Sequence, residues 1–261
     1  MSDQIRFNDG AAYERYMGKW SRLAGATFLD WLAPHPDLRW LDVGCGNGAF
    51  TELIAERSAP VALFGIDPSQ EQLTYARTRP ALRSAQLLDG DAMAQPFPDN
   101  AFDVAVMPLV IFFVPDPARG VAEMVRVVRP GGTVAAYAWD MMGGGFPYQS
   151  LRSEMHDLGI AVPVPPSPDA SRLDAMRDLW ISAGLESVQT REIAMQRTFT
   201  DFDDYWESVR GGPSVGSKLE AMAPARLALL KTRMHARLSE HASGRICCSA
   251  RANAVMGRVA T

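Results

Sequence analysis

A glycine-rich loop is the segment of this sequence best suited to chemistry. Gly44, Gly46 and Gly48 directly follow an apolar run and precede a helical pattern. Glycines at such a turn permit a tight bend and let a ligand approach bare backbone beside the positive end of a helix. The loop alone is weak evidence, because Gly44, Gly46 and Ala49 also satisfy the relaxed dinucleotide fingerprint, and a tight turn that binds nothing would use the same glycines.

Three aspartates sharpen this interpretation. Asp42 precedes the first glycine, where a carboxylate would repel a pyrophosphate but suits a ligand that carries an ammonium or sulfonium group. Asp67 ends the second apolar run, where a carboxylate can accept hydrogen bonds from both ribose hydroxyls. Asp91 follows the third run, placed to accept from an adenine amine, with the amide of Ala92 available to a ring nitrogen. Any one of them could be a helix cap or a loop carboxylate, but together they predict a site at one sheet edge.

Five apolar runs alternate with helical patterns up to about Asp140, which is typical of a parallel sheet with crossover helices. One helix is expected over Phe50 and Ile54, a second after the capping box that starts at Ser69, and a third that ends before Pro130. We therefore predict a doubly wound α/β sheet. The runs are Leu38–Val43, Val61–Ile66, Ala85–Leu88, Phe102–Met107 and Thr133–Trp139.

The flanking segments predict further helices and two more strand-like runs. The first forty residues suggest a helix pair, whereas 141–150 and 161–168 suggest no regular element. A proline is expected to break the last helical segment at Pro224. The expected elements after Asp140 are a helix over Ser171–Ala183, a strand over Leu185–Phe199, helices over Asp203–Arg210 and Lys218–His241, and a strand over Arg245–Val259.

The composition narrows the class of protein. The 261 residues are 47% hydrophobic and 21% charged, as in ordinary globular proteins. A net charge of −4 disfavours a protein that binds nucleic-acid backbones, since those need a basic face. Three cysteines without zinc spacing favour neither a disulfide framework nor a metal site. The opening residues suggest no signal segment, and no apolar stretch is long enough to span a membrane, so the expected location is the cytoplasm.

Taken in order, these motifs resemble those of class I S-adenosylmethionine-dependent methyltransferases. The resemblance covers about residues 38 to 139. The segments at 13–21 and 205–206 further resemble the branch of ubiquinone- and menaquinone-biosynthesis methyltransferases, which mostly act on small molecules. The core motifs are Leu41–Gly48 (LDVGCGNG), Gly65–Ser69, Gly90–Ala92 with Pro96–Asp99, Val114–Pro117 and Arg126–Gly132.

The resemblance implies a complete architecture. It is a seven-stranded, mostly parallel, Rossmann-like sheet in which the last strand pairs antiparallel between two others near one edge. A helical insertion at 200–243 precedes that strand. We expect a single domain over 1–261, with an N-terminal helical lid at 1–36, a cofactor-binding core at 37–140, and variable substrate-side segments with the C-terminal strands at 141–261.

The resemblance also implies a cofactor, S-adenosyl-L-methionine, which becomes S-adenosyl-L-homocysteine. The glycine loop would lie against its methionine portion, and Asp42 would hold both the loop and the ammonium. Asp67 would take the ribose, Asp91 the adenine, and Met107 would line the channel near the sulfonium. The full set of expected cofactor-binding residues is Asp42, Gly44, Cys45, Gly46, Asp67, Pro68, Asp91, Ala92 and Met107.

The acceptor pocket is less well marked. We expect a small apolar or aromatic acceptor about the size of a quinone, although each aromatic residue expected around it could instead pack in the core. Many relatives carry a histidine pair where this chain has Phe112 and Phe113, so no catalytic base is assigned, and His156, Asp140 and Tyr13 are weak candidates. The expected pocket residues are Tyr13, Tyr16, Trp20, Tyr148, Tyr205 and Trp206.

Several alternatives remain open at this stage. A nicotinamide-dependent oxidoreductase shares the glycine loop and Asp67, and a catalytically silent cofactor-binding protein would keep the whole pocket. A nucleic-acid substrate is disfavoured, because the residues after the fourth run, Met107–Val110, differ from the motif of exocyclic-amine methyltransferases. The basic residues from Arg226 to Arg237 suggest a solvated helix face. The methylated atom and the choice between monomer and homodimer stay undecided.

Overall fold

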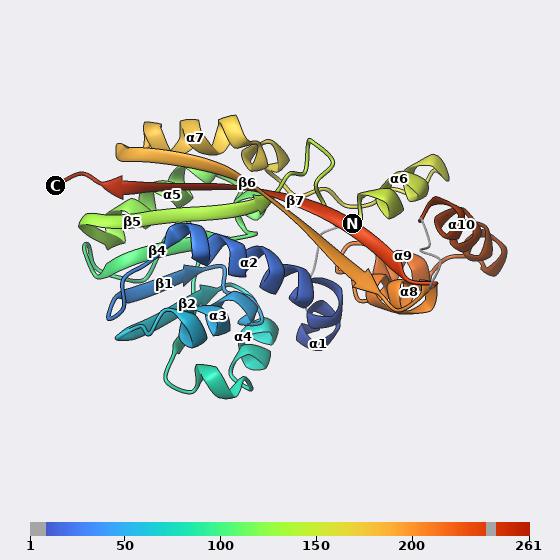
Figure 1. Ribbon diagram of the computed structural model, residues 1–261, viewed down its shortest axis with the longest axis horizontal. Helices are drawn as coiled ribbons and strands as arrows, with labels where there is room; N and C mark the ends of the chain where they lie inside the picture. The colour runs from blue at the N-terminus through green and yellow to red at the C-terminus, as the bar shows by residue number, and fades with distance from the viewer. Residues whose placement is uncertain (1–8, 239–243) are drawn as a thin grey trace.

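The chain folds around one seven-stranded sheet (Figure 1). The computed structural model describes residues 9–238 and 244–261. Within these residues the strand order is β3-β2-β1-β4-β5-β7-β6. The strands are β1 (Arg39–Val43), β2 (Ala62–Asp67), β3 (Gln86–Asp89), β4 (Phe102–Pro108), β5 (Val128–Trp139), β6 (Leu185–Phe199) and β7 (Ile246–Val259).

Strand pairing confirms the predicted topology. The first five strands pair in parallel, and β1 lies between β2 and β4, so the order reverses there. This reversal is the position where open α/β sheets bind ligands. The last strand, β7, pairs antiparallel with both β5 and β6. The expected insertion of the final strand near one edge is therefore confirmed.

Helices cover both faces of the sheet. On one face α5 packs on β4 and β5 and α7 on β6 and β7, whereas α2 and α3 pack together on the other face (Figure 1). The helices are α1 (Gly10–Tyr13), the π-helix η1 (Glu14–Gly18), α2 (Lys19–Leu32), α3 (Ala49–Arg57), α4 (Gln70–Ala76), η2 (Pro80–Leu82), η3 (Ile111–Phe113), α5 (Pro117–Val127), α6 (Gln149–Asp157), η4 (Pro168–Ser171), α7 (Leu173–Ser182), α8 (Phe202–Arg210), α9 (Gly216–Glu220) and α10 (Pro224–Arg237).

The expected helix pair at the N-terminus is wrong: α1, η1 and α2 form one continuous helical segment. Asp9 caps its start by accepting a hydrogen bond from the Ala12 amide (2.8 Å). The π-turn in the middle shifts the register of the side chains without interrupting the helix. The segment ends at Ala33, whose φ of 43° is left-handed.

Other boundaries also differ from the prediction. Helix α5 ends at Val127, before Pro130 as expected, but the Pro130–Gly132 segment belongs to β5 and is not a turn between the helix and the strand. Helix α6 was not predicted. The break at Pro224 is confirmed, because α10 begins at this residue. A proline is tolerated at the first helical position, where the backbone amide would have no partner within the helix. The expected helical extension of α10 to His241 reaches beyond the described residues.

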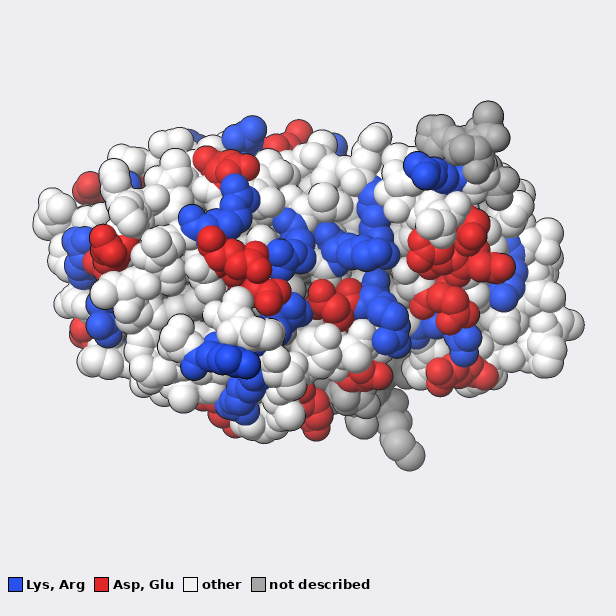
Figure 2. All heavy atoms as spheres, turned by 60° about the horizontal axis from the view of Figure 1, so that its bottom comes forward, with Lys and Arg blue, Asp and Glu red and all other residues white. Residues whose placement is uncertain are grey.

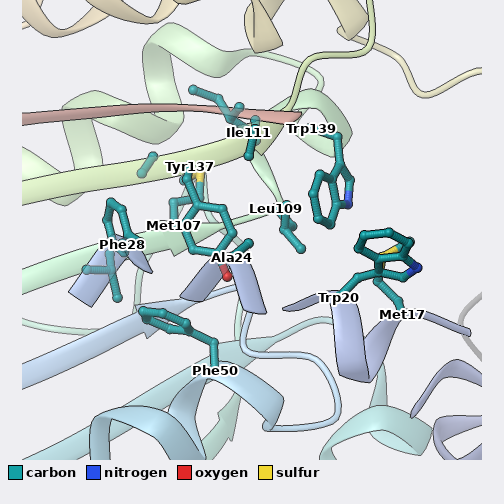
Figure 3. Close-up of a cluster of buried hydrophobic side chains, with 14 of the residues drawn as sticks. Met17, Trp20, Ala24, Phe28, Phe50, Met107, Leu109, Ile111, Tyr137 and Trp139 are labelled. Carbon is teal, nitrogen blue, oxygen red and sulfur yellow. The ribbon is translucent and has the colours of Figure 1, made fainter. Parts of the chain in front are cut away.

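A dense aromatic core lies between α2 and the sheet (Figure 3). Phe28 of α2 packs on Tyr137 of β5, with their ring centroids 4.9 Å apart. Trp20 meets Trp139 edge to face, and both are almost fully buried. This packing fixes α2 beside the carboxyl ends of the central strands, so the N-terminal helical segment is anchored next to the glycine loop.

Acidic and basic side chains lie among one another on the face shown in Figure 2. Several pair directly: Arg22 and Arg79 both contact Glu52, at 2.9 and 2.7 Å. Among the residues that the structure describes, no helix combines the length and apolar character needed to cross a bilayer.

Candidate functional site

A cavity of about 410 Å³ opens at the carboxyl edge of the sheet. We call it the main cavity; its volume falls within the usual range for small-molecule and cofactor sites. It is lined by the segments that follow β1, β2, β3 and β4, together with the N-terminal helical segment. Its lining includes Tyr13, Asp42, Gly44, Cys45, Gly46, Asn47, Asp67, Pro68, Gly90, Asp91, Ala92, Met93, Pro108, Leu109, Val110, Phe113 and Tyr137.

The glycine loop presents bare backbone to this cavity. The amides of Gly44 and Cys45 both donate to the Ile66 carbonyl, at 2.8 and 2.9 Å, which ties the loop to β2. Gly44 has a φ of +75°, and a Cβ there would overlap the Val110 side chain. A Cβ on Gly46 would meet only an Asp67 oxygen, 4.0 Å away, so this glycine leaves room for a ligand against the chain.

Asp42 is fully buried on the cavity wall. Its Oδ2 accepts a hydrogen bond from the Thr51 hydroxyl (2.7 Å), whereas its Oδ1 has no partner within the described structure. Burial raises the pKa of Asp42 to about 7, against the opposing effect of the Thr51 hydrogen bond. A buried carboxylate oxygen without a donor is costly, and a cationic group in the cavity would compensate that cost.

Asp67 and Asp91 line the same cavity, and each carboxylate accepts hydrogen bonds from backbone amides of the surrounding loops. Asp67 Oδ2 accepts from the Gly46 amide and its Oδ1 from the Ser69 amide, both at 2.9 Å. Burial raises the pKa of Asp67, although these two hydrogen bonds oppose the shift. Asp91 Oδ1 accepts from the Met93 amide at 2.8 Å. Each carboxylate oxygen can accept a further hydrogen bond from a ligand.

One of the nine expected cofactor-binding residues is placed differently. Asp42, Gly44, Cys45, Gly46, Asp67, Pro68, Asp91 and Ala92 all line the main cavity. Met107 does not: its side chain is completely buried in the hydrophobic core (Figure 3). Its successors Pro108 and Leu109 line the cavity instead. Leu109 has a left-handed φ of 61°, an unusual conformation for a bulky residue.

A smaller cavity of about 40 Å³ adjoins the main one. We call it the side cavity; Tyr13, Leu109 and Phe113 line both. The remaining lining residues of the side cavity are Tyr16, Met17, Phe112, Trp139, Met141, Phe146, Arg152, Pro165, Pro213 and Ser214.

Of the six residues expected around an acceptor, only Tyr13 and Tyr16 line either cavity. Trp20, Tyr148, Tyr205 and Trp206 are buried in an adjoining aromatic cluster. The Tyr148 hydroxyl donates to the Tyr16 carbonyl (2.7 Å) and accepts from Trp20 Nε1 (3.2 Å). These four residues thus support the wall of the side cavity instead of forming it.

Buried Arg197 completes this support. Its guanidinium donates to the Tyr16 carbonyl (3.4 Å), the Tyr148 hydroxyl (3.3 Å) and the Ser208 hydroxyl (3.2 Å). It also lies over the Phe199 ring, 4.2 Å from the centroid. The network joins the π-turn to β6 and α8, and therefore fixes Tyr16 beside the side cavity.

The three weak candidates for a catalytic base differ in burial and in whether they line a cavity. The His156 side chain is 90% exposed and lines neither cavity. Asp140 is buried but accepts hydrogen bonds from Arg251 and the Gly143 amide, and it too lies outside both linings. Tyr13 lines both cavities, and burial raises its pKa, so its hydroxyl stays protonated at neutral pH. Phe113, which stands where many relatives carry a histidine, lines the cavity but its side chain cannot accept a proton.

The N-terminal helical segment is held to the glycine loop by a polar clamp. Glu14 pairs with Arg79 and accepts from Asn47 Nδ2 (2.8 Å). Arg79 Nε donates to the Asn47 carbonyl at 2.7 Å. Asn47 is almost completely buried within this contact. The clamp thus holds the segment that carries Tyr13, which lines the cavity.

Comparison with known proteins agrees with this geometry. Residues 41–136 match the methyltransferase domain family. The chain is 42% identical over 95 residues to 2-methyl-6-phytyl-1,4-hydroquinone methyltransferase 2 of Oryza sativa subsp. japonica, covering 36% of this chain and 27% of that protein. It is 32% identical over 157 residues to malonyl-[acyl-carrier protein] O-methyltransferase of Serratia marcescens, covering 56% and 59%. The matches thus span about a quarter and three-fifths of these relatives.

The fold is shared with solved methyltransferase structures. Phosphoethanolamine N-methyltransferase 2 of Haemonchus contortus, in complex with S-adenosyl-L-methionine, superposes with a TM-score of 0.58 at 16% identity, covering 96% of this chain and 56% of that one. The resemblance seen in the sequence motifs is confirmed. Residues 41–136 therefore match the methyltransferase domain family, and the chain shares the fold of a solved methyltransferase that binds S-adenosyl-L-methionine.

Proposed function

We propose that this protein transfers a methyl group from S-adenosyl-L-methionine to a small molecule with an apolar or aromatic body. The observation that carries the proposal is Asp42, which is buried on the wall of the main cavity and has one oxygen without a donor among the described residues. A cationic amino-acid portion in the cavity would stabilise the ionised form of this carboxylate through its opposite charge. A pyrophosphate would face a like charge at the same point, which disfavours a nicotinamide dinucleotide.

Other residues of the main cavity would each bind a different part of the cofactor. Asp67 would accept from the ribose hydroxyls while its existing hydrogen bonds keep the glycine loop in shape. Asp91 and the Ala92 amide would recognise the adenine. When bound, the cofactor supplies an activated methyl group for in-line displacement. The largely apolar walls exclude water and align the acceptor, and such alignment can lower a barrier by about 7–11 kcal/mol.

We further propose that residues 1–261 act as one unit. The segment at 1–36, described from residue 9, would be the lid, 37–140 the cofactor-binding core, and 141–261 the acceptor side. Tyr13 and Tyr16 are the lid residues that reach the cavities. Tyr13 would contact the acceptor as a neutral phenol.

Calorimetric titration of the purified protein with S-adenosyl-L-homocysteine, and separately with NAD⁺ and NADP⁺, tests the cofactor. We expect binding of the first alone, and an Asp42→Asn variant should weaken it. Binding of a nicotinamide dinucleotide in its place would overturn the proposal. A catalytically silent protein would bind the nucleoside but release no labelled methyl group to any hydroxylated or amine-bearing small molecule.

A further inference from the structure

The side cavity contains a cation that no carboxylate among the described residues neutralises. Arg152 of α6 lines it, donates from Nη2 to the Pro163 carbonyl (3.1 Å), and lies over the Phe146 ring, 5.7 Å from the centroid. Within residues 9–238 and 244–261, no carboxylate forms an ion pair with it. Two other partly buried arginines, Arg79 and Arg126, each pair with carboxylates.

This arrangement leaves most of the guanidinium available. A guanidinium has five N–H donors in a planar fork that matches a carboxylate with two parallel hydrogen bonds. Only one of these donors has an acceptor in the described structure. Burial lowers the pKa of Arg152, which reflects the cost of holding this charge away from water. An anion in the cavity would remove part of that cost.

The size of the side cavity limits what can enter it. A volume of about 40 Å³ is close to that of one or two water molecules. It therefore suits a single polar group and not a whole acceptor. Because Tyr13, Leu109 and Phe113 line both cavities, the body of a molecule anchored in the side cavity can extend toward the main one.

The other walls suit the same group. Met17, Phe112 and Trp139 are apolar and exclude water from it. The Tyr16 hydroxyl makes no hydrogen bond within the described part of the chain, and burial raises its pKa well above the usual value, so it stays a donor. A carboxylate at Arg152 would thus meet a charged fork and a neutral phenol, with no competing anion in the lining.

We propose that Arg152 binds an anionic group of the methyl acceptor, and that the acceptor is a small carboxylic acid with an apolar body. This inference rests on the proposed function, because it places the acceptor beside the methyl-donor cavity. It adds a negative charge to the proposed acceptor, a property that the apolar lining of the main cavity does not specify. Arg152 is then a specificity-determining residue for the transfer.

The test uses the full chain saturated with S-adenosyl-L-homocysteine. Binding of 4-hydroxyphenylacetate and of its neutral amide, 4-hydroxyphenylacetamide, is measured by ligand-observed NMR on the wild type and on Arg152→Gln. We expect the wild type to prefer the acid by roughly 10- to 100-fold, the range for a hydrogen bond to a charged group. The preference should vanish in Arg152→Gln, and Arg152→Lys should restore only part of it, because lysine lacks the fork.

Arg177→Gln is the matched control, since Arg177 is exposed on α7 and lines neither cavity. It removes the same charge and should leave the acid preference unchanged. Equal binding of acid and amide to the wild type, no binding of the acid up to its solubility limit, or an acid preference that survives in Arg152→Gln would each overturn the proposal. Titration with S-adenosyl-L-homocysteine alone tests the donor site separately, so failure of the proposed function is distinguishable.

Discussion

Asp42 is buried, and one of its oxygens has no donor within the described structure, so both features disfavour its ionised form. Its raised pKa, about 7, means that the free protein holds a proton there below neutral pH. A cationic ligand needs the ionised form. We therefore expect the affinity for S-adenosyl-L-homocysteine to rise as pH increases toward 7 and to level off above it. Calorimetry between pH 5.5 and about 8.5 would measure this.

The same residue should make the protein less stable at high pH. Between the unfolded pKa of 3.8 and the folded value of about 7, the native state binds a proton that the unfolded chain has lost, so stability falls as pH rises through this window. Asp42→Asn removes the effect and should raise the free energy of unfolding at pH 8 by up to about 4 kcal/mol, with little gain near pH 4. A gain that does not depend on pH would contradict the assignment.

Asp67 is expected to contribute to donor binding more directly. Asp67→Ala removes a carboxylate that accepts from Gly46 and Ser69 and that faces the cavity. We expect S-adenosyl-L-homocysteine to bind at least about 30-fold more weakly, with the circular dichroism spectrum unchanged. Asp89→Ala is the control. Asp89 ends β3 and is the register partner of Asp67 at the end of β2, but it is exposed and lies outside the cavity lining. Similar losses in both variants would argue against the site.

The glycine loop shows how one element depends on its neighbour. Gly44 and Gly144 have nearly the same φ, +75° and +76°, but a Cβ on Gly44 would overlap Val110 whereas one on Gly144 would meet nothing within 4 Å. Gly144→Ala should therefore cost only the left-handed strain, about 1–2 kcal/mol. Gly44→Ala should cost about 1–3 kcal/mol more and weaken donor binding. Denaturant unfolding of both variants measures the difference.

A double variant checks the cause of that difference. Truncation by Val110→Ala removes the two methyl groups nearest the added Cβ. Stability of Gly44→Ala/Val110→Ala should therefore recover relative to Gly44→Ala. If Gly44→Ala and Gly144→Ala are equally destabilised, the contact with Val110 does not restrict the loop.

The elements of the sheet were predictable because each strand is an apolar run between turn residues. The first four predicted runs start within one residue of β1, β2, β3 and β4, and the fifth lies inside β5. The cavity side of the site was predictable for the same reason: parallel strand ends meet at one edge. The N-terminal segment was not, since a π-turn shifts the helical period at Glu14–Gly18 without any signature residue.

The lining of the side cavity could not be predicted from composition. Tyr16, Trp20 and Tyr148 look alike in the sequence, and only packing decides that Tyr16 reaches a cavity while the other two support it. The position of Met107 in the core could not be predicted for a related reason: β4 is buried on both faces, so alternation could not tell which residue faces the cavity. Arg152 resembles any helix-surface arginine until α6 is placed beside the side cavity.

At the scale of the whole molecule, the long strands β6 and β7 carry α8, α9 and α10 beyond the sheet core (Figure 1). Arg197 of β6 joins that insertion to the N-terminal helical segment through Ser208 and the Tyr16 carbonyl. The Glu14 clamp joins the same segment to the glycine loop. The segment therefore contacts both the glycine loop and the helical insertion, which supports the proposal that it acts as a lid.

Loosening the clamp should affect ligand release more than stability. Glu14→Ala removes the partner of Arg79 and Asn47 but no core side chain, so the melting temperature should change by only a few degrees. With the lid less firmly held, S-adenosyl-L-homocysteine should dissociate several-fold faster while its association rate changes little. Stopped-flow fluorescence of the buried tryptophans would follow both rates.

Glu56→Ala provides the comparison, because Glu56 pairs with Arg22 on the surface away from the cavity lining. It removes the same charge and an ion pair to the same helical segment, yet it should leave both rates unchanged. If Glu56→Ala accelerates release as much as Glu14→Ala, the effect comes from the overall charge. If neither variant changes release, the segment does not control exit from the cavity, and the clamp serves only to hold the folded chain together.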